Sequence, residues 1–456
     1  MDAAGSPAVI AQPIDAKDVA VVVAAFAEAV VAHRRTIAPS SAPAMRLAVA
    51  CGRHSHLCLP NDALVVDLSL LRDVHVDVAA RTVDVGGGCL QQEVDAATRE
   101  HGLAVTCGHA GSTGVGGLVL QGGHGYLERA FGLAIDNLLE VDVVLASGDM
   151  VTASAEEEAD LFWAVRGGGG NFGVVTRFRF QLHAMPDLIY CGMRLHVPLG
   201  RAWFPDRHEI INSWSSLILD GPRQASGLLI MPVGGPIIES LLYVGDADEG
   251  RDFFAKHRAT VGYPLRDTLK PQNYFDVMQK MAPDNAGAYY MSGVLLDDMT
   301  NETAEALSSV VQKVNGPGKH TSCAVLLLPM GGAVNEVDAD ATANPHRDSS
   351  FWVLIQGEWQ GKPGTAEYDD ARSRVVEWTR RVKAAVKDST SGAYGVLGEV
   401  AQHAADGEDD DVGHFQAMMA DRNVYGANLA RLQAIKAVYD ADNVFTVNDN
   451  IVPKAE

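Results

Sequence analysis

A run of glycines between Gly108 and Gly125 is the first feature of this chain that points to chemistry. It reads Gly-His-Ala-Gly-Ser-Thr-Gly-Val-Gly-Gly-Leu-Val-Leu-Gln-Gly-Gly-His-Gly. Glycine has no Cβ and tolerates positive φ, so the backbone N–H groups of such a run can closely approach phosphates or a flat cofactor. A surface linker is the alternative, but linkers rarely carry apolar residues such as those at 115 and 118–120. We therefore expect this segment to contact a cofactor.

A second glycine cluster, residues 166–173, formally contains the GxGxxG pattern at Gly168, Gly170 and Gly173. The dinucleotide-binding fingerprint requires a strand before the glycines and a helix after them. Here a helical pattern at 156–165 comes first and an alternating, strand-like stretch at 174–180 follows. We therefore interpret the cluster as a turn that leads into a buried strand beside the cofactor, not as a Rossmann site.

Hydrophobic periodicity predicts the elements that position these glycines. In the first 180 residues we expect one α+β unit with strands at 7–13, 45–51, 63–68 and 74–85 and helices at 15–33 and 90–101. Beyond Met185 the pattern changes to longer strands at 188–197, 227–233, 239–244, 288–296, 323–330 and 351–359, with helices at 207–217, 248–257, 301–314 and 365–386. This second part predicts a mostly antiparallel sheet backed by helices, and its inward face would supply a substrate pocket.

Composition excludes several classes of partner. The 456 residues carry a formal net charge of −22, which argues against nucleic acid or an anionic membrane as a partner. The six cysteines show neither CxxC pairing nor metal-ligand spacing, so we expect free thiols and no metal site. Residues 1–17 lack the pattern of a secretory signal, and the apolar run at 19–32 is too short to span a bilayer, so we expect a cytoplasmic protein.

Five blocks, in this order and spacing, resemble the FAD-linked oxidases of the berberine bridge enzyme type, within the vanillyl-alcohol oxidase superfamily. The blocks are VACGRHS at 49–55, VVDLS at 65–69, GSTGVGG at 111–117, the stretch from Tyr126 to Leu138, and DLFWAVRG at 160–167. The tail from Tyr425 to Ile451 is similar to that family's C-terminal segment, which returns to the flavin. The resemblance implies a two-part FAD-binding domain of the PCMH type at 1–185, an α+β substrate domain at 186–400, and a C-terminal segment at 401–456.

The resemblance also implies how the cofactor is held. The family commonly attaches its flavin through a histidine in a Gly-Gly-His-Ser turn, and His54 stands at that place, with Arg53 replacing the second glycine. A covalent 8α-histidyl FAD is therefore expected. Some members add a second bond from a cysteine, but alignment on Gly114 puts Ala110 at that position, so we expect a single attachment and an ordinary thiol at Cys107.

We expect the remaining cofactor contacts to come from the two glycine segments, the strand after the second one, and the tail. These residues are Gly52, Arg53, Ser55, His56, Ser112, Thr113, Gly116, Gly117, Gly122, Gly123, Gly125, Val175, Asn448 and Asn450. Val115 lies where the family controls access of oxygen to the flavin, and its small side chain favours an oxidase.

The catalytic base is not assigned by the resemblance. Alternation along 351–359 puts Trp352, Leu354, Gln356 and Glu358 on one side of the strand. Leu354 stands where the family frequently has a polar residue. Glu358 is either a base or a solvated strand end, and Tyr394 is either a catalytic phenol or a packed tyrosine. The substrate pocket is expected to include His124, Tyr126, Trp352, Leu354 and Gln356.

The leading interpretation is an FAD-dependent oxidase that takes a hydride from a small organic molecule, a natural-product intermediate, and passes the electrons to O2. One alternative is a carbohydrate or alkaloid amine oxidase on the same scaffold. Another is a flavoprotein that promotes a non-redox cyclisation, which the apolar Leu354 would allow.

Overall fold

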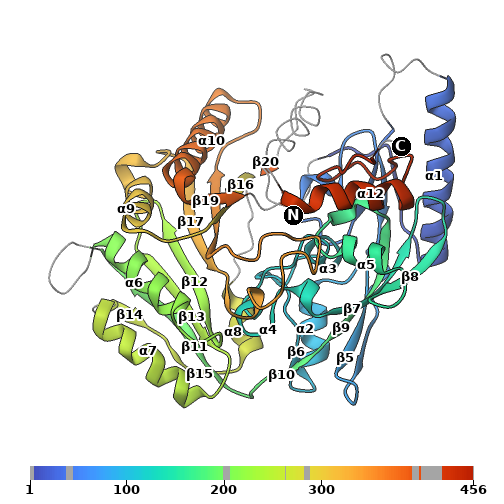
Figure 1. Ribbon diagram of the computed structural model, residues 1–456. Coiled ribbons are helices and arrows are strands. Elements are labelled where there is room, and N and C mark those ends of the chain that lie inside the picture. Colours follow the sequence, from blue (N-terminus) through green and yellow to red (C-terminus); the bar gives the residue numbers. More distant parts are fainter. Residues whose placement is uncertain are drawn as a thin grey trace.

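The computed structural model describes residues 5–36, 45–198, 206–261, 263–281, 288–392, 400–401 and 424–454. Four β-sheets lie within these residues, three in the N-terminal part and one large sheet in the C-terminal part (Figure 1). None of the helices in the described ranges combines the length and apolarity needed to cross a bilayer.

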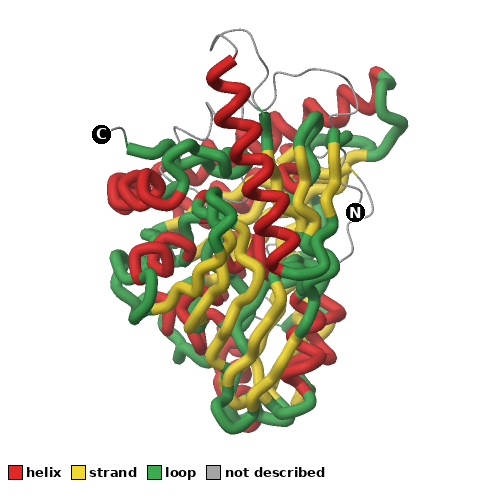
Figure 2. The backbone as a smooth tube through the Cα atoms, turned by 90° about the vertical axis from the view of Figure 1, so that its right-hand side faces the viewer, coloured by secondary structure: helices red, strands yellow, loops and turns green. Residues whose placement is uncertain are grey.

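A small parallel sheet and one long helix begin the N-terminal part. The strands, in the order β1-β3-β2, are β1 (Val9–Ala11), β3 (Leu64–Asp67) and β2 (Leu47–Ala50). Helix α1 (Ala16–Thr36) begins where the Asp15 carboxylate accepts the backbone N–H of Asp18 at 2.9 Å. Its buried residues follow a spacing of three or four, so one face packs on the sheet and on tail residues Val444 and Phe445. Figure 2 shows α1 crossing in front of the neighbouring strands.

An antiparallel five-stranded sheet, ordered β4-β5-β9-β7-β8, forms the rest of the N-terminal framework. Its strands are β4 (Val74–Asp77), β5 (Thr82–Gly86), β9 (Val174–Gln181), β7 (Leu138–Val144) and β8 (Met150–Ser154). A two-stranded sheet joins β6 (Leu103–Ala104) to β10 (His183–Ala184). The helices of this part are α2 (Gln91–Arg99), α3 (Val115–Val119), α4 (Glu128–Phe131) and α5 (Ala159–Val165).

The C-terminal part is built on a ten-stranded antiparallel sheet. Its strands are β11 (Ile189–His196), β12 (Ala225–Pro232), β13 (Ile237–Tyr243), β14 (Arg266–Asp267), β15 (Lys270–Gln272), β16 (Ala288–Leu296), β17 (Thr321–Pro329), β18 (Phe351–Trp359), β19 (Thr390–Gly392) and β20 (Val400–Ala401). Its helices are α6 (Arg207–Leu219), α7 (Ala247–Val261), α8 (Tyr274–Met281), α9 (Asn301–Val310) and α10 (Ala366–Val386). The α+β class and the antiparallel sheet backed by helices are as predicted, whereas the helix α8 and the short strands β14, β15, β19 and β20 were not predicted.

The two faces of the large sheet pack against different partners. Along β18, Phe351, Val353 and Ile355 belong to a core shared with the helices α6, α9 and α10. The alternate residues Trp352 and Leu354 belong to the core of the N-terminal part. The inner face of the sheet therefore covers the N-terminal part, while the helices cover its outer face (Figure 1).

Helix α12 (Leu429–Tyr439) brings the chain back to the N-terminal part, where it lies beside α5 (Figure 1). The Lys436 ammonium, fully buried, donates to the backbone oxygens of Asn171 and Phe445 and pairs with the Asp440 carboxylate at 2.6 Å. These contacts fix the tail after α12 against the second glycine cluster. The domain limits expected from the sequence stay a prediction.

Candidate cofactor and active site

The turn that carries His54 is held tightly against the first glycine segment. A Cβ on Gly52 would lie 2.1 Å from the backbone nitrogen of Gly114, and a Cβ on Gly114 would lie 2.2 Å from the nitrogen of Gly52. Contacts below 3.0 Å do not occur for real Cβ atoms, so both positions require glycine. The sequence prediction assigned Gly52 to the cofactor, but the structure shows a separate reason for glycine there, namely the approach of two backbones.

His54 itself bridges the two loops, because its Nε2 lies 3.1 Å from Ser112 Oγ. The imidazole is half-buried, and burial lowers its pKa below the usual value of 6.5, against a smaller opposing effect of the Ser112 backbone. Within the described residues, no hydrogen bond to Nδ1 is present. A neutral imidazole with one nitrogen oriented by a hydroxyl is a nucleophile in a fixed position.

The glycines of the first segment divide into packed and open positions. Gly116 approaches the backbone oxygen of Gly87, since a Cβ would lie 3.1 Å from it. Gly123 has a φ of +78° and sits against Ala134, and a Cβ on Gly125 would lie 1.5 Å from the carbonyl oxygen of Cys107. By contrast, a Cβ on Gly117 would meet nothing within 4 Å. Gly117 therefore faces open space, whereas the protein's own packing already requires glycine at 123 and 125.

Other predicted contact residues lie in the same two loops. The Ser55 hydroxyl accepts the N–H of Leu57 at 3.2 Å, and Thr113 is held by backbone bonds to Ala110 and Gln91. His56 begins the 3₁₀ helix His56–Cys58, and its side chain lies outside the described part of the structure. Gly122 has a φ of +118°, which favours glycine.

Val115 and Val175 are both buried in the N-terminal core. Val175 pairs with Val143 in the β9–β7 ladder. Val115 N–H donates to the carbonyl of Cys89 at the start of α3. Their roles at the adenine end and in oxygen access stay predictions.

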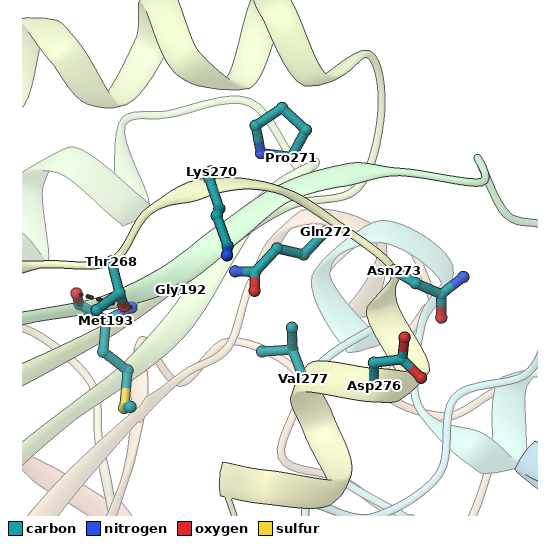
Figure 3. A pocket seen from close by; sticks show the side chains of 9 residues that line it. All are labelled: Gly192, Met193, Thr268, Lys270, Pro271, Gln272, Asn273, Asp276 and Val277. Atoms are coloured by element: carbon teal, nitrogen blue, oxygen red, sulfur yellow. Dashed lines mark hydrogen bonds between the residues drawn. The ribbon is translucent and has the colours of Figure 1, made fainter.

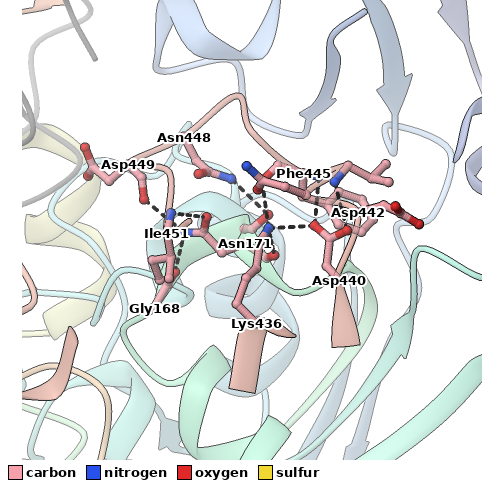
Figure 4. A network of polar contacts seen from close by, with 12 residues as sticks. Gly168, Asn171, Lys436, Asp440, Asp442, Phe445, Asn448, Asp449 and Ile451 are labelled. Atoms are coloured by element: carbon pink, nitrogen blue, oxygen red, sulfur yellow. Dashed lines mark hydrogen bonds and ion pairs between the residues drawn. The ribbon is translucent and has the colours of Figure 1, made fainter. Parts of the chain in front are cut away.

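The second glycine cluster binds the C-terminal tail (Figure 4). Asn171 Nδ2 donates to the backbone oxygens of Gly168 and Asp449, at 2.8 and 3.1 Å, and its Oδ1 accepts the N–H of Ile451 at 3.0 Å. The cluster follows α5 and precedes β9, so the helix and strand stand in the order predicted from the sequence. Sequence reasoning missed Asn171, because its partners Asp449 and Ile451 in the tail lie 278 and 280 residues away.

The two tail asparagines offer unused acceptors beside this cluster. Asn448 Nδ2 donates to the carbonyl of Gly170 at 3.1 Å. The side-chain oxygens of Asn448 and Asn450 are buried and accept no hydrogen bond from any described residue. Buried amide oxygens without partners are rare in folded proteins and point to a missing donor. The nearest atom to a Cβ on Gly170 would be Asn448 Nδ2 at 3.9 Å, so the backbone there is also open.

A buried, hydrogen-bonded histidine and glutamate lie under the inner face of the large sheet. His124 Nδ1 is 2.8 Å from Glu128 Oε2, which also accepts the N–H of Gly125 at 3.1 Å, and both side chains are 3% exposed. The His124 ring centroid is 5.6 Å from that of Trp352. Sequence reasoning placed His124 and Trp352 in one pocket but missed Glu128, which the i, i+4 spacing to His124 could have indicated.

Two further predicted substrate residues, Leu354 and Gln356, and the candidate base Glu358 lie on β18. Leu354 is buried, and the Gln356 amide donates to the half-buried Glu358 carboxylate at 3.2 Å. Tyr126 is buried beside His109, and burial raises the pKa of its phenol. Tyr394 lies outside the described residues.

Two buried arginines fix the N-terminal part to the large sheet. Arg129 donates to the carbonyls of Ala225, Met330 and Ile218, at 2.8, 2.5 and 2.7 Å. Arg347, which precedes β18, makes a two-point contact with the Asp136 carboxylate at 2.7 and 2.8 Å. Charge-assisted contacts of this kind are strong and directional. They fix the position of the large sheet relative to the N-terminal part, and a cofactor and a substrate would bind between the two.

The edge of the large sheet holds a separate open cleft of about 380 Å³ (Figure 3). Most of its polar side chains have partners, for example Gln272 Nε2 on the carbonyl of Cys191 and Asp276 on Arg99. None of the residues predicted for the cofactor or the substrate lines it. Its lining residues are Gly192, Met193, Thr268, Lys270, Pro271, Gln272, Asn273, Asp276 and Val277. Among the described residues, no group of three or more His, Cys, Asp or Glu could hold a metal ion.

Acid is expected to destabilise the fold through His109. Burial, followed by the neighbouring His124, lowers its pKa from 6.5 to about 3. The unfolded chain takes up a proton as the pH falls through 6.5, and the folded chain does not, so the free energy of unfolding falls below that pH. For this half-buried group we expect the free energy of unfolding to fall by about 1–2 kcal/mol between pH 8 and pH 5. Urea unfolding at both pH values measures it, and the pH dependence should be smaller in His109→Gln; equal dependences would contradict the assignment to His109.

Comparison with known proteins gives two family matches and relatives that align with most of the chain. A family model described as "FAD binding domain" matches residues 7–154, and one described as "Berberine and berberine like" matches residues 408–452. The FAD-linked oxidoreductase pgmH of Aspergillus terreus is 30% identical over 422 residues, covering 88% of this chain and 82% of that protein. (R)-6-hydroxynicotine oxidase of Paenarthrobacter nicotinovorans is 29% identical over 414 residues, covering 86% and 82%.

Solved structures confirm the fold. Glucooligosaccharide oxidase from Acremonium strictum, which has a 6-S-cysteinyl, 8α-N1-histidyl FAD, superposes with a TM-score of 0.80 at 20% identity. The superposition covers 99% of this chain and 93% of that one. At this identity the likeness establishes the architecture alone.

Proposed function

Because the chain belongs to the FAD-linked oxidoreductases of the berberine bridge enzyme-like family, we propose that it is an oxidase whose FAD is bound covalently through His54. Its substrate would be a small organic molecule, a natural-product intermediate, and O2 would accept the electrons. The observation that carries the proposal is the position of His54, a neutral imidazole bonded to Ser112 in a turn that packs on the glycine segment.

Residues of the two glycine segments and of the tail fit an FAD molecule. Gly117 and Gly170 leave the backbone open, and the buried oxygens of Asn448 and Asn450 need hydrogen-bond donors, which the ribityl chain and ring of a flavin possess. These residues, together with Ser112 and Gly116, would hold the cofactor. FAD, when bound, supplies the acceptor for a hydride from substrate.

The attachment would be single. Ala110, at the position where other members have a second attachment, carries no thiol. Cys107 is buried, and burial raises the pKa of its thiol to about 12, so the nucleophilic thiolate is not formed at neutral pH. With Nε2 of His54 bonded to Ser112 Oγ, Nδ1 is the nitrogen left for the bond to flavin.

The inner face of β18 would bind the substrate opposite the glycine segment. Trp352 and Leu354 would supply an apolar surface, and Gln356 a polar contact. Removal of a substrate proton needs a base. We propose Tyr394 or Glu358 for it, with the buried His124–Glu128 pair holding the Trp352 side of the pocket in place.

The relatives support oxidation of a small molecule but differ in substrate. One is named for 6-hydroxynicotine and another for a glucooligosaccharide, so an alkaloid amine or a carbohydrate is the alternative substrate class. The one observation that favours a non-redox cyclisation is the apolar Leu354. This residue of β18 cannot act as the base that removes a substrate proton during oxidation.

Anaerobic reduction of the flavin distinguishes these functions. The purified protein is mixed with phenolic and alcoholic natural products, cyclic amines and oligosaccharides while the flavin absorbance is followed. We expect one class to bleach the flavin, and admission of air to restore the colour and to release H2O2. A compound that binds tightly and is converted without bleaching would contradict the oxidase.

A further inference from the structure

Arg53, directly before His54, has a backbone conformation that an arginine rarely adopts. Its φ is +56°, in the left-handed region that favours glycine. A side chain in this region costs free energy, which must be offset by contacts elsewhere. The contact of Arg53 is an ion pair.

The partner of Arg53 is a buried carboxylate at the end of β3. Arg53 Nη2 lies 2.5 Å from Asp67 Oδ2; the Asp67 side chain is 1% exposed and that of Arg53 is 42% exposed. The same carboxylate accepts the Gln12 amide at 3.1 Å and the Ser69 N–H at 3.1 Å. It is therefore held from three directions, and Arg53 is the one cation among its described partners.

The His54 turn is thus fixed on both sides. On one side Gly52 packs against Gly114, and on the other Arg53 is bound to Asp67. His54 follows immediately and meets Ser112. Because a change of φ at Arg53 would redirect the next side chain, the ion pair bears directly on where the imidazole lies.

We infer that the Arg53–Asp67 ion pair positions His54 for attachment of the flavin, so that Arg53 is a positioning residue. This inference rests on the proposed covalent attachment. In that step His54 exchanges its N–H bond for an N–C bond to the flavin methyl carbon, which loses one hydrogen. The two protons and two electrons released in this exchange would pass to the flavin ring and then to O2, which gives H2O2.

The test measures the rate of attachment in protein purified from riboflavin-limited cells and then given FAD. Arg53→Gly relieves the backbone strain but removes the ion pair, and Asp67→Asn removes the charge while leaving Arg53 in place. We expect both variants to attach flavin on the order of tenfold more slowly at saturating FAD. The FAD concentration for half-maximal rate should change little, which separates positioning from a loss of cofactor binding. Arg53→Lys should restore part of the rate.

Arg81 provides the matched control, since it is exposed and has a φ of +53° in the turn between β4 and β5. Arg81→Gly relieves similar strain and should leave attachment unchanged. Equal attachment rates in wild type, Arg53→Gly and a folded Asp67→Asn would overturn this inference alone. A wild-type protein that binds FAD but never attaches it would overturn the proposed covalent link as well.

Discussion

Replacement of His54 by alanine is expected to abolish covalent attachment of the flavin. The wild-type protein, precipitated with acid, should keep its yellow colour in the pellet, whereas His54→Ala should release all of its flavin into the supernatant. The reason is that the His54 imidazole is a neutral nucleophile oriented by a second group, the Ser112 hydroxyl. The midpoint potential of the flavin should also fall, because the histidyl bond tends to raise it.

The control for this experiment is His75→Ala. His75 lies exposed on β4, so its loss should change neither the fold nor the flavin. Flavin that stays in the pellet of His54→Ala would contradict attachment at this residue. Acid precipitation, followed by absorbance of both fractions, requires no knowledge of the substrate.

Substitution of Gly114 by alanine should have the largest effect on the fold around the cofactor. The added methyl group would lie 2.2 Å from the backbone nitrogen of Gly52 and 2.5 Å from Cys51 Sγ, so the two loops must separate. Overpacking of this kind costs about 1–3 kcal/mol of unfolding free energy. His54 would move away from Ser112 at the same time, and covalent flavin should be lost with the stability.

Gly117→Ala is the matched control, because its methyl group would project into open space. It should leave the unfolding free energy of flavin-free protein unchanged, while weakening FAD binding if the cofactor occupies that space. Urea unfolding and flavin titration of both variants measure the two effects. Equal stability of Gly114→Ala and wild type would show that the loops are not packed as described.

Local sequence pattern predicted the six longest strands of the large sheet and four of the five helices described in that part. In the N-terminal part it missed β7 and β8, and it predicted one strand at 74–85 where the structure has the antiparallel strands β4 and β5. The strand at 351–359 was predicted with the observed limits, because its apolar residues alternate between two cores. Helix α8 was missed because it has only eight residues, too few turns for a clear periodicity. Strands β14 and β15 were missed because they are two and three residues long and exist through pairing with β11.

The candidate site was predictable where a motif is local. The glycine runs and His54 stand out in the sequence, but the bond between His54 and Ser112 joins residues 58 positions apart and needs the fold. The partners of Arg129 lie 89 to 201 residues away, which no periodicity could indicate. The sequence also could not show that Gly52, Gly123 and Gly125 already serve packing, because a close backbone contact is visible only in three dimensions.

The proposed function depends most on the covalent bond between His54 and the flavin, and peptide mass analysis of the wild-type protein tests this bond directly. Trypsin cleaves after Arg53 and Arg72, so the peptide 54–72 contains His54, while the peptide 100–129 contains Cys107 and Ala110. We predict the mass of FAD, less two hydrogens, on peptide 54–72 and no flavin on peptide 100–129. An unmodified peptide 54–72 from yellow protein, or flavin on peptide 100–129, would contradict a single attachment through His54.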